Sequence, residues 1–168
     1  QVGFVYSISL LLYGATQWDV IKRDGSSKKY WDHFGEIVFD NDQPVWNWYV
    51  HPFSGSLIFQ YYRFKGHNKR DATLYTFISS ALFEFTGEIY TEPSSMQDLY
   101  QTPIFGAVVG LAFENISIYL HNLDNPVASF FGYVFNPFFL FEKNEQELIV
   151  HSSTNFKNNV GVNVSWNF

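Results

Sequence analysis

Four side chains in the middle of the chain have the types that acid–base chemistry needs. His51 titrates near neutral pH and can accept and return a proton. Glu84 and Glu88 are four residues apart, so a helix places both carboxylates on one face, where close acids raise one another's pKa. Asp98 follows in a polar stretch. Brought into one cleft, these four residues would form a catalytic group, although the sequence alone leaves open whether the protein is an enzyme.

Three further polar residues are candidates for ligand binding. Arg63 carries a planar guanidinium that can hold a phosphate or carboxylate through two parallel hydrogen bonds. Asp40 and Asp42 lie in a dense polar cluster before Pro44, a pattern typical of an Asx turn. A cation site is the alternative there, because hard cations prefer oxygen ligands, but the cluster lacks the length and the glycine of an EF-hand loop. We therefore assign no metal and no cofactor.

Each of these candidates also has a purely structural interpretation. In that interpretation His51 caps a helix or bonds to the backbone, and Arg63 forms a buried ion pair with Glu84 or Glu88 that fixes the register of two helices. The sequence contains no nucleophile elbow, phosphate-binding loop, His-Glu-x-x-His motif or dinucleotide-binding glycine pattern. No reaction class is therefore indicated by a motif.

A polar hinge, residues 91–98, separates two apolar helices and must position the acidic candidates. Asp71 is a suitable N-cap for the first helix, which we expect to continue to Tyr90. An earlier helix is expected from Pro52 to about Phe64, because proline is well tolerated at the first helical position. The order of elements is therefore helix, helix, hinge, helix.

The hinge contains two signals for the start of a helical segment. Ser95 and Asp98 have the spacing of a capping box, with Asp in place of the usual Glu, which predicts a short turn. Thr102 and Pro103, just after the hinge, predict the N-cap and first residue of a longer helix that reaches His121.

Small residues on this second helix predict a close helix–helix contact. Gly106 and Gly110 have the G-x-x-x-G spacing, which lets two backbones approach. At the carboxyl end, apolar and polar residues alternate over 160–168, as in a half-buried strand, and 148–156 is expected to pair with it. The C-terminal β-hairpin then spans about 147–168.

The expected fold is α+β and mainly helical, with apolar helices around the polar hinge and the C-terminal hairpin. The length fits a single domain, residues 1–168, with its helical core at about 46–122. Gln1 follows no Met and no basic segment, which we interpret as a mature chain after removal of a signal peptide, with a shortened sequence as the alternative.

The composition indicates contact with lipid or with a large partner surface. Aromatic residues make up 21% of the chain, and charged residues make up 15%, against about 25% in ordinary soluble domains. The net charge of −6 argues against nucleic acid as a partner, since nucleic-acid binding needs a basic face. Cysteine is absent, which excludes disulfide and thiol chemistry.

Several motifs in combination resemble the DUF3943 family. They are Phe39-Asp40-Asn41-Asp42-Gln43, Asn47, His51-Pro52-Phe53, Gly55, Tyr61-Tyr62-Arg63, Gly66, Phe83-Glu84-Phe85, Gly87-Glu88, Pro93-Ser94, Asp98-Leu99, Gly106 and Gly110. The resemblance covers roughly Phe39 to Ser117. It implies a protein of the bacterial envelope, of a kind found in Bacteroidota and other diderms. It implies no activity, because none is established for the family.

The last residues support the same location. Phe168, with Trp166 two positions before it, resembles the last-strand signal of outer-membrane β-barrel proteins. A spanning barrel needs at least about eight strands, which this chain cannot supply beside its helices. We therefore expect Trp166 and Phe168 to insert into a partner or the membrane, with an ordinary terminal strand as the alternative.

These observations predict an outer-membrane-associated structural or accessory subunit of a bacterial envelope complex. It would dock through its aromatic and apolar surface and its terminal strand. The expected partners are an outer-membrane β-barrel or another envelope protein, and membrane lipid. The expected location is the outer membrane or its periplasmic face. The alternative is an envelope hydrolase or transferase that acts on a lipid or glycan through His51, Glu84, Glu88 and Asp98.

Overall fold

Helices form nearly all of the regular structure in the computed structural model, which describes residues 1–39 and 41–141. The elements are α1 (Val2–Thr16), α2 (Trp18–Asp24), α3 (Ser27–Asp32), β1 (Ile37–Val38), η1 (Trp46–Val50), α4 (His51–Phe64), α5 (Lys69–Thr86), η2 (Glu88–Tyr90), β2 (Ser94–Ser95), α6 (Asp98–Tyr100), η3 (Gln101–Phe105), α7 (Gly106–His121), α8 (Pro126–Phe135) and η4 (Pro137–Phe141).

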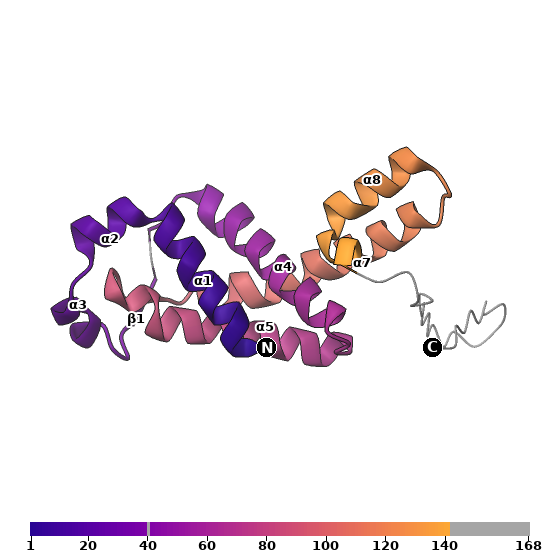
Figure 1. Cartoon of the computed structure of the whole chain (residues 1–168). Helices are drawn as coiled ribbons and strands as arrows, with labels where there is room; N and C mark the ends of the chain where they lie inside the picture. The colour runs from indigo at the N-terminus through magenta and orange to yellow at the C-terminus, as the bar shows by residue number, and fades with distance from the viewer. Residues whose placement is uncertain (40, 142–168) are drawn as a thin grey trace.

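Helix α4 lies at the centre of the fold and contacts α5, α7 and the π-helical turn η3. Figure 1 shows an elongated molecule in which α1 crosses α5. Helices α2 and α3 lie together at one end of the molecule. At the opposite end α8 folds back along α7. The expected helix from Pro52 to about Phe64 is confirmed as α4, with Pro52 in its first turn.

The expectation of an α+β fold with a C-terminal hairpin is wrong. In the residues that the structure describes, the only sheet is a pair of two-residue strands, β1 and β2, which run parallel and pair Ile37 with Ser94 and Val38 with Ser95. The hairpin expected at about 147–168 lies outside the described residues, together with Trp166 and Phe168. Alternating residues in a short segment indicate a strand only weakly, because no partner strand can be identified from the pattern.

Both apolar helices around the hinge differ in their ends from the expectation. Asn68 caps α5 by accepting a hydrogen bond from Asp71 N, so Asp71 lies in the first turn instead of at the cap. The helix ends at Thr86, and a separate 3-10 turn, η2, carries Glu88. Pro103 lies within η3, so the regular part of the second helix begins only at Gly106.

The close contact predicted from Gly106 and Gly110 is present between α4 and α7. A Cβ on Gly106 would lie 2.6 Å from the backbone of Gly55, and one on Gly110 would lie 3.0 Å from the carbonyl oxygen of Ser56. The absence of side chains at Gly55 and Gly106 therefore sets the distance between the two helices. This contact also holds η3 against the start of α4, where His51 lies.

The distribution of polarity over these helices is inverted relative to a water-soluble helical domain. Helix α5 buries Thr76, Ser79, Ser80 and Glu84, and most of the large apolar side chains of the helices lie outside. They include Phe4, Leu11 and Leu12 of α1, Leu74, Phe77 and Ile78 of α5, Ile116 and Tyr119 of α7, and Val127, Phe130 and Val134 of α8. Exposed apolar surface on this scale usually marks contact with a membrane or a protein.

One helical stretch in the described part of the chain, Asp98–His121, is long and apolar enough to cross a membrane, judged by length and composition alone. It joins α6, η3 and α7. About a third of its most apolar window is buried against the rest of the protein. Asp98, at the start of this stretch, is a buried polar residue. The same continuous stretch also carries apolar side chains on the outside of the protein.

Candidate functional site

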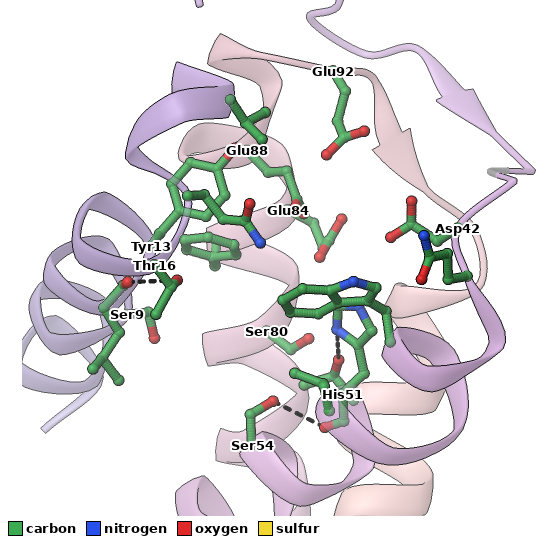
Figure 2. Close-up of a pocket in the computed structure, with 18 of the residues that line it drawn as sticks. Ser9, Tyr13, Thr16, Asp42, His51, Ser54, Ser80, Glu84, Glu88 and Glu92 are labelled. Atoms are coloured by element: carbon green, nitrogen blue, oxygen red, sulfur yellow. Dashed lines mark hydrogen bonds between the residues drawn. The ribbon is translucent and has the colours of Figure 1, made fainter. Parts of the chain in front are cut away.

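A cavity of about 590 Å³ opens between α1, the start of α4 and the end of α5. Its lining is Ser9, Leu12, Tyr13, Thr16, Gln17, Val20, Arg23, Asp24, Asn41, Asp42, Gln43, Trp46, Val50, His51, Ser54, Ile58, Ser80, Phe83, Glu84, Glu88, Glu92 and Thr102. In Figure 2, Ser9, Tyr13 and Thr16 come from one side, while His51 and Asp42 lie on the other. Glu84 points between these walls. The cavity therefore has a mostly polar lining, with acidic groups and an imidazole, and a smaller share of apolar side chains.

Three carboxylates form a cluster beside this cavity. One oxygen each from Glu84, Glu88 and Asp98 lie within 4.8 Å of one another. Glu84 and Asp98 are each 3% exposed, so their charges lie in the protein interior. Asp98 approaches from behind the cavity wall that Glu84 and Glu88 form. Glu84 and Glu88 lie close together as expected, but the prediction that one helix carries both is wrong, because α5 ends at Thr86 and Glu88 lies in η2.

Repulsion and burial act together on this cluster. Burial, followed by the negative charge of Glu84, raises the pKa of the Glu88 carboxyl well above its ordinary value. The Oε2 atom of Glu88 is buried and has no hydrogen-bond partner within residues 1–39 and 41–141. A buried acceptor without a donor costs stability. The buried Glu88 carboxyl therefore lowers the stability of the fold.

His51 lies between the acidic cluster and η3. Its Nε2 lies 3.4 Å from Asp98 Oδ1, and its Nδ1 lies 3.3 Å from Thr102 Oγ1. The proline after His51 lies in the first turn of α4, where its missing N–H is harmless. The imidazole thus stands between a carboxylate and a hydroxyl. A carboxylate near one ring nitrogen and a hydroxyl near the other are also the neighbours of a proton-transferring histidine in hydrolases, and the approach to Asp98 Oδ1 is an ion-pair contact.

The hinge holds the acidic residues in place through short polar contacts. Ser95 N donates to Glu84 Oε2 at 3.3 Å, and Ser94 Oγ donates to the Glu84 carbonyl at 3.1 Å. Asp98 N donates to Ser95 Oγ at 3.2 Å, which confirms the half of the capping box that the sequence predicts. The pairing of β1 with β2 fixes the same hinge. These bonds therefore join the hinge to the end of α5 beside the cluster.

Arg63 makes a different ion pair from those considered in the sequence. Its Nε and NH2 bind both oxygens of Glu114, the closest at 2.7 Å, and its NH1 donates to the carbonyl of His67. The pair joins α4 to α7, away from Glu84 and Glu88. Of the other ligand-binding candidates, Asp42 lines the cavity and Asp40 lies outside the described residues.

The Arg63–Glu114 pair predicts a large loss of stability when only one partner is removed. Glu114→Leu leaves a mostly buried guanidinium without a counter-charge, and we expect a cost toward the lower end of about 3–5 kcal/mol. The double variant Arg63→Met/Glu114→Leu should recover most of it. Denaturant unfolding measures the stability of the single and the double variant. Asp32→Asn serves as a control, because the Lys28–Asp32 pair is exposed. Equal stability of Glu114→Leu and the parent chain would contradict this role.

Sequence reasoning missed three residues that shape the cavity: Tyr13, Trp46 and Glu92. Tyr13 lies in an apolar segment far from the other residues in sequence, and nothing in that segment indicates which helix it will meet. In the fold its hydroxyl lies 2.5 Å from Thr91 Oγ1 in the hinge. Burial raises the pKa of Tyr13 to about 12, and the neighbouring Glu88 carboxylate contributes to the shift.

The raised pKa of Tyr13 predicts a loss of stability in alkali. The unfolded chain gives up this proton near pH 10, whereas the fold retains it to about pH 12. Stability from this group is therefore complete below pH 10 and declines as the pH rises from 10 to 12. We expect the unfolding free energy of Tyr13→Phe, which lacks the Thr91 bond, to be lower at neutral pH but to fall less steeply above pH 10. Parallel curves for the two chains would be inconsistent with a buried phenol.

Comparison with protein families places the site in context. The profile of a family described as a domain of unknown function, DUF3943, matches residues 36–138. The chain belongs to the DUF3943 family. The resemblance seen in the sequence is thereby confirmed. The DUF3943 region contains all four predicted catalytic residues, while α1, which forms one wall of the cavity, precedes it. No curated protein and no solved structure matches the chain.

Proposed function

We propose that this DUF3943 protein is an envelope enzyme that hydrolyses an ester of a lipid or glycan at the outer membrane or its periplasmic face. The observation that carries the proposal is the position of His51 between Asp98 and Thr102, at the rim of a cavity that also holds Glu84 and Glu88. Four residues converge here, and their side-chain types suit acid–base chemistry. They are His51, Glu84, Glu88 and Asp98. A structural role would not require an open cavity beside them.

The proposed reaction uses His51 twice. As a general base it removes a proton from a water molecule in the cavity, and the water oxygen forms a bond to the carbonyl carbon or phosphorus of the ester. The bond from that atom to the leaving oxygen then breaks, and the imidazolium returns its proton to the leaving oxygen. Asp98 orients the ring and stabilises its transient positive charge. No oxidant or second substrate is needed.

The apolar surroundings favour a lipid as the substrate. Leu12, Val20 and Ile58 line the cavity next to the acidic groups, so a substrate with an apolar chain and a polar head fits the lining. The exposed apolar faces of α1 and α5 adjoin the same cavity and would bring it to a lipid surface. The membership in DUF3943 supports no particular substrate, because the family has no assigned function.

The proposal is tested by giving the purified protein mixed envelope lipids in vesicles and identifying released products by mass spectrometry. We expect time-dependent release of a fatty acid or a phosphorylated head group. Heat-denatured protein serves as the background. Release no faster than this background from vesicles that contain glycerophospholipids, lipid A and lipoprotein peptides would overturn the proposal.

A second candidate function is favoured by the exposed apolar side chains. Trp31, Trp48 and Tyr49 are among the most exposed residues, and they lie outside the cavity. An accessory subunit that docks on an outer-membrane barrel would cover such a surface. Isolation of the native protein from detergent-solubilised envelope tests this. A barrel recovered in equal amount would support the subunit, and a monodisperse monomer carrying only lipid would exclude it.

A further inference from the structure

The acidic cluster has the geometry of a cation site. Three carboxylate oxygens from Glu84, Glu88 and Asp98 lie within 4.8 Å of one another, and they come from α5, η2 and α6. A single ion of ordinary size can touch oxygens at such separations, because metal–oxygen distances of about 2.0–2.6 Å place two ligands up to roughly 5 Å apart. The residues converge on one point from three elements, which distinguishes them from acids scattered on a surface.

A second observation points to a ligand at this point. The buried Oε2 of Glu88 has no hydrogen-bond partner among the residues that the structure describes, although Glu88 lines the cavity beside Glu84. Folded proteins seldom leave a buried carboxylate oxygen without a donor. A bound cation would satisfy this oxygen and would offset the repulsion among the three carboxylates, which is strong in a low-dielectric interior.

We propose that Glu84, Glu88 and Asp98 bind one divalent cation, which stands beside His51 at the cavity. Oxygen ligands suit hard cations such as Mg²⁺, Ca²⁺ and Mn²⁺, and the nearby imidazole makes Mn²⁺ a suitable probe. The site differs from the Asp40–Asp42 cluster, the alternative cation site that the sequence pattern suggested.

The role of the cation rests on the proposed hydrolysis, whereas its binding does not. Attack on an ester creates negative charge on the carbonyl or phosphoryl oxygen, and three carboxylates alone would oppose that charge. A divalent cation in their midst would offset most of this negative charge and would polarise the ester oxygen as a Lewis acid. His51 would still remove the proton from the attacking water.

Binding is tested by titrating the full chain, treated with EDTA and then desalted, with Mn²⁺ and following free Mn²⁺ by electron paramagnetic resonance. We expect one saturable site per chain. Glu84→Gln and Asp98→Asn should each weaken binding by about tenfold or more, since ligand loss costs at least as much as loss of an outer-shell partner. The control Glu36→Gln makes the same change in net charge on an exposed residue and should bind as the parent chain does. Circular dichroism verifies that each variant is folded.

The outcomes separate this inference from the proposed function. Saturable binding that Glu84→Gln and Asp98→Asn weaken supports the site, even if no lipid is hydrolysed. The absence of saturable Mn²⁺ binding to the folded parent chain at millimolar concentrations overturns it, as does binding that Glu84→Gln and Asp98→Asn leave unchanged. Hydrolysis that continues at full rate in excess EDTA overturns the catalytic role of the cation, while leaving the proposed function standing.

Discussion

Replacement of His51 by Gln lowers the proposed hydrolytic rate by about 10²–10⁴-fold, the usual contribution of a positioned general base. Glutamine retains a polar group that can contact Asp98 and Thr102, so the fold is expected to persist. It cannot accept the proton of the attacking water. The loss should therefore appear in kcat, with KM nearly unchanged, because the cavity still binds the substrate. Initial rates over a range of lipid concentrations give both constants.

The matched control for this variant is His67→Gln. His67 lies outside the cavity, where its Nε2 contacts the side chain of Gln1. The His67→Gln substitution makes the same chemical change away from the acidic cluster, so kcat and KM should both stay close to the parent values. If His51→Gln keeps kcat within about threefold of the parent, His51 is not the general base. A fall in thermal stability alone would instead indicate the structural role considered in the sequence.

Gly55→Ala should be among the most destabilising single substitutions in the described chain. The added Cβ would lie 1.8 Å from the carbonyl oxygen of Thr102 and 3.0 Å from the Cα of Gly106. These neighbours are backbone atoms, so α4 and α7 must separate. Overpacking usually costs about 1–3 kcal/mol, and a backbone clash of this depth belongs at or above the upper end. Denaturant unfolding monitored by tryptophan fluorescence measures the cost.

A helical glycine with open surroundings provides the control. A Cβ on Gly14 of α1 meets nothing within 4 Å, so Gly14→Ala should stabilise the chain by roughly 0.5–1 kcal/mol through its helix propensity. Gly55→Ala should also reduce activity, because Thr102 and His51 face one another across the same contact. Equal effects of the two substitutions would show that α4 and α7 do not approach as closely as the structure indicates.

The sequence was informative where local rules decide the structure. Pro52 predicts the start of α4, and the Ser95–Asp98 spacing predicts the turn in the hinge, because both depend on a few neighbouring backbone groups. The G-x-x-x-G spacing predicts a close contact for the same reason. The acidic cluster was partly predictable, since the spacing of Glu84 and Glu88 brings them close even though Glu88 lies in η2, and a hinge of known position comes after them.

The sequence was uninformative where partners come from distant segments. Arg63 binds Glu114, which lies 51 residues away, although Glu84 and Glu88 are nearer in sequence. Tyr13 reaches the hinge 78 residues later. The strand pattern at the carboxyl end suggested an α+β fold, but the sheet that forms among the described residues joins two short segments, β1 and β2, that show no strand pattern at all. Such pairings depend on the packing of whole helices.

The thermal stability of Glu88→Gln most directly tests the central claim, that the acidic cluster serves a reaction and not the fold. The melting temperature is measured after EDTA treatment, beside the parent chain. The amide can donate a hydrogen bond within the cluster and cannot ionise, whereas burial and the charge of Glu84 oppose ionisation of the Glu88 carboxyl. We therefore predict a higher melting temperature, by about 2–4 °C for each kcal/mol of repulsion relieved, together with weakened Mn²⁺ binding. A lower melting temperature would mean that Glu88 stabilises the fold, and would contradict the account.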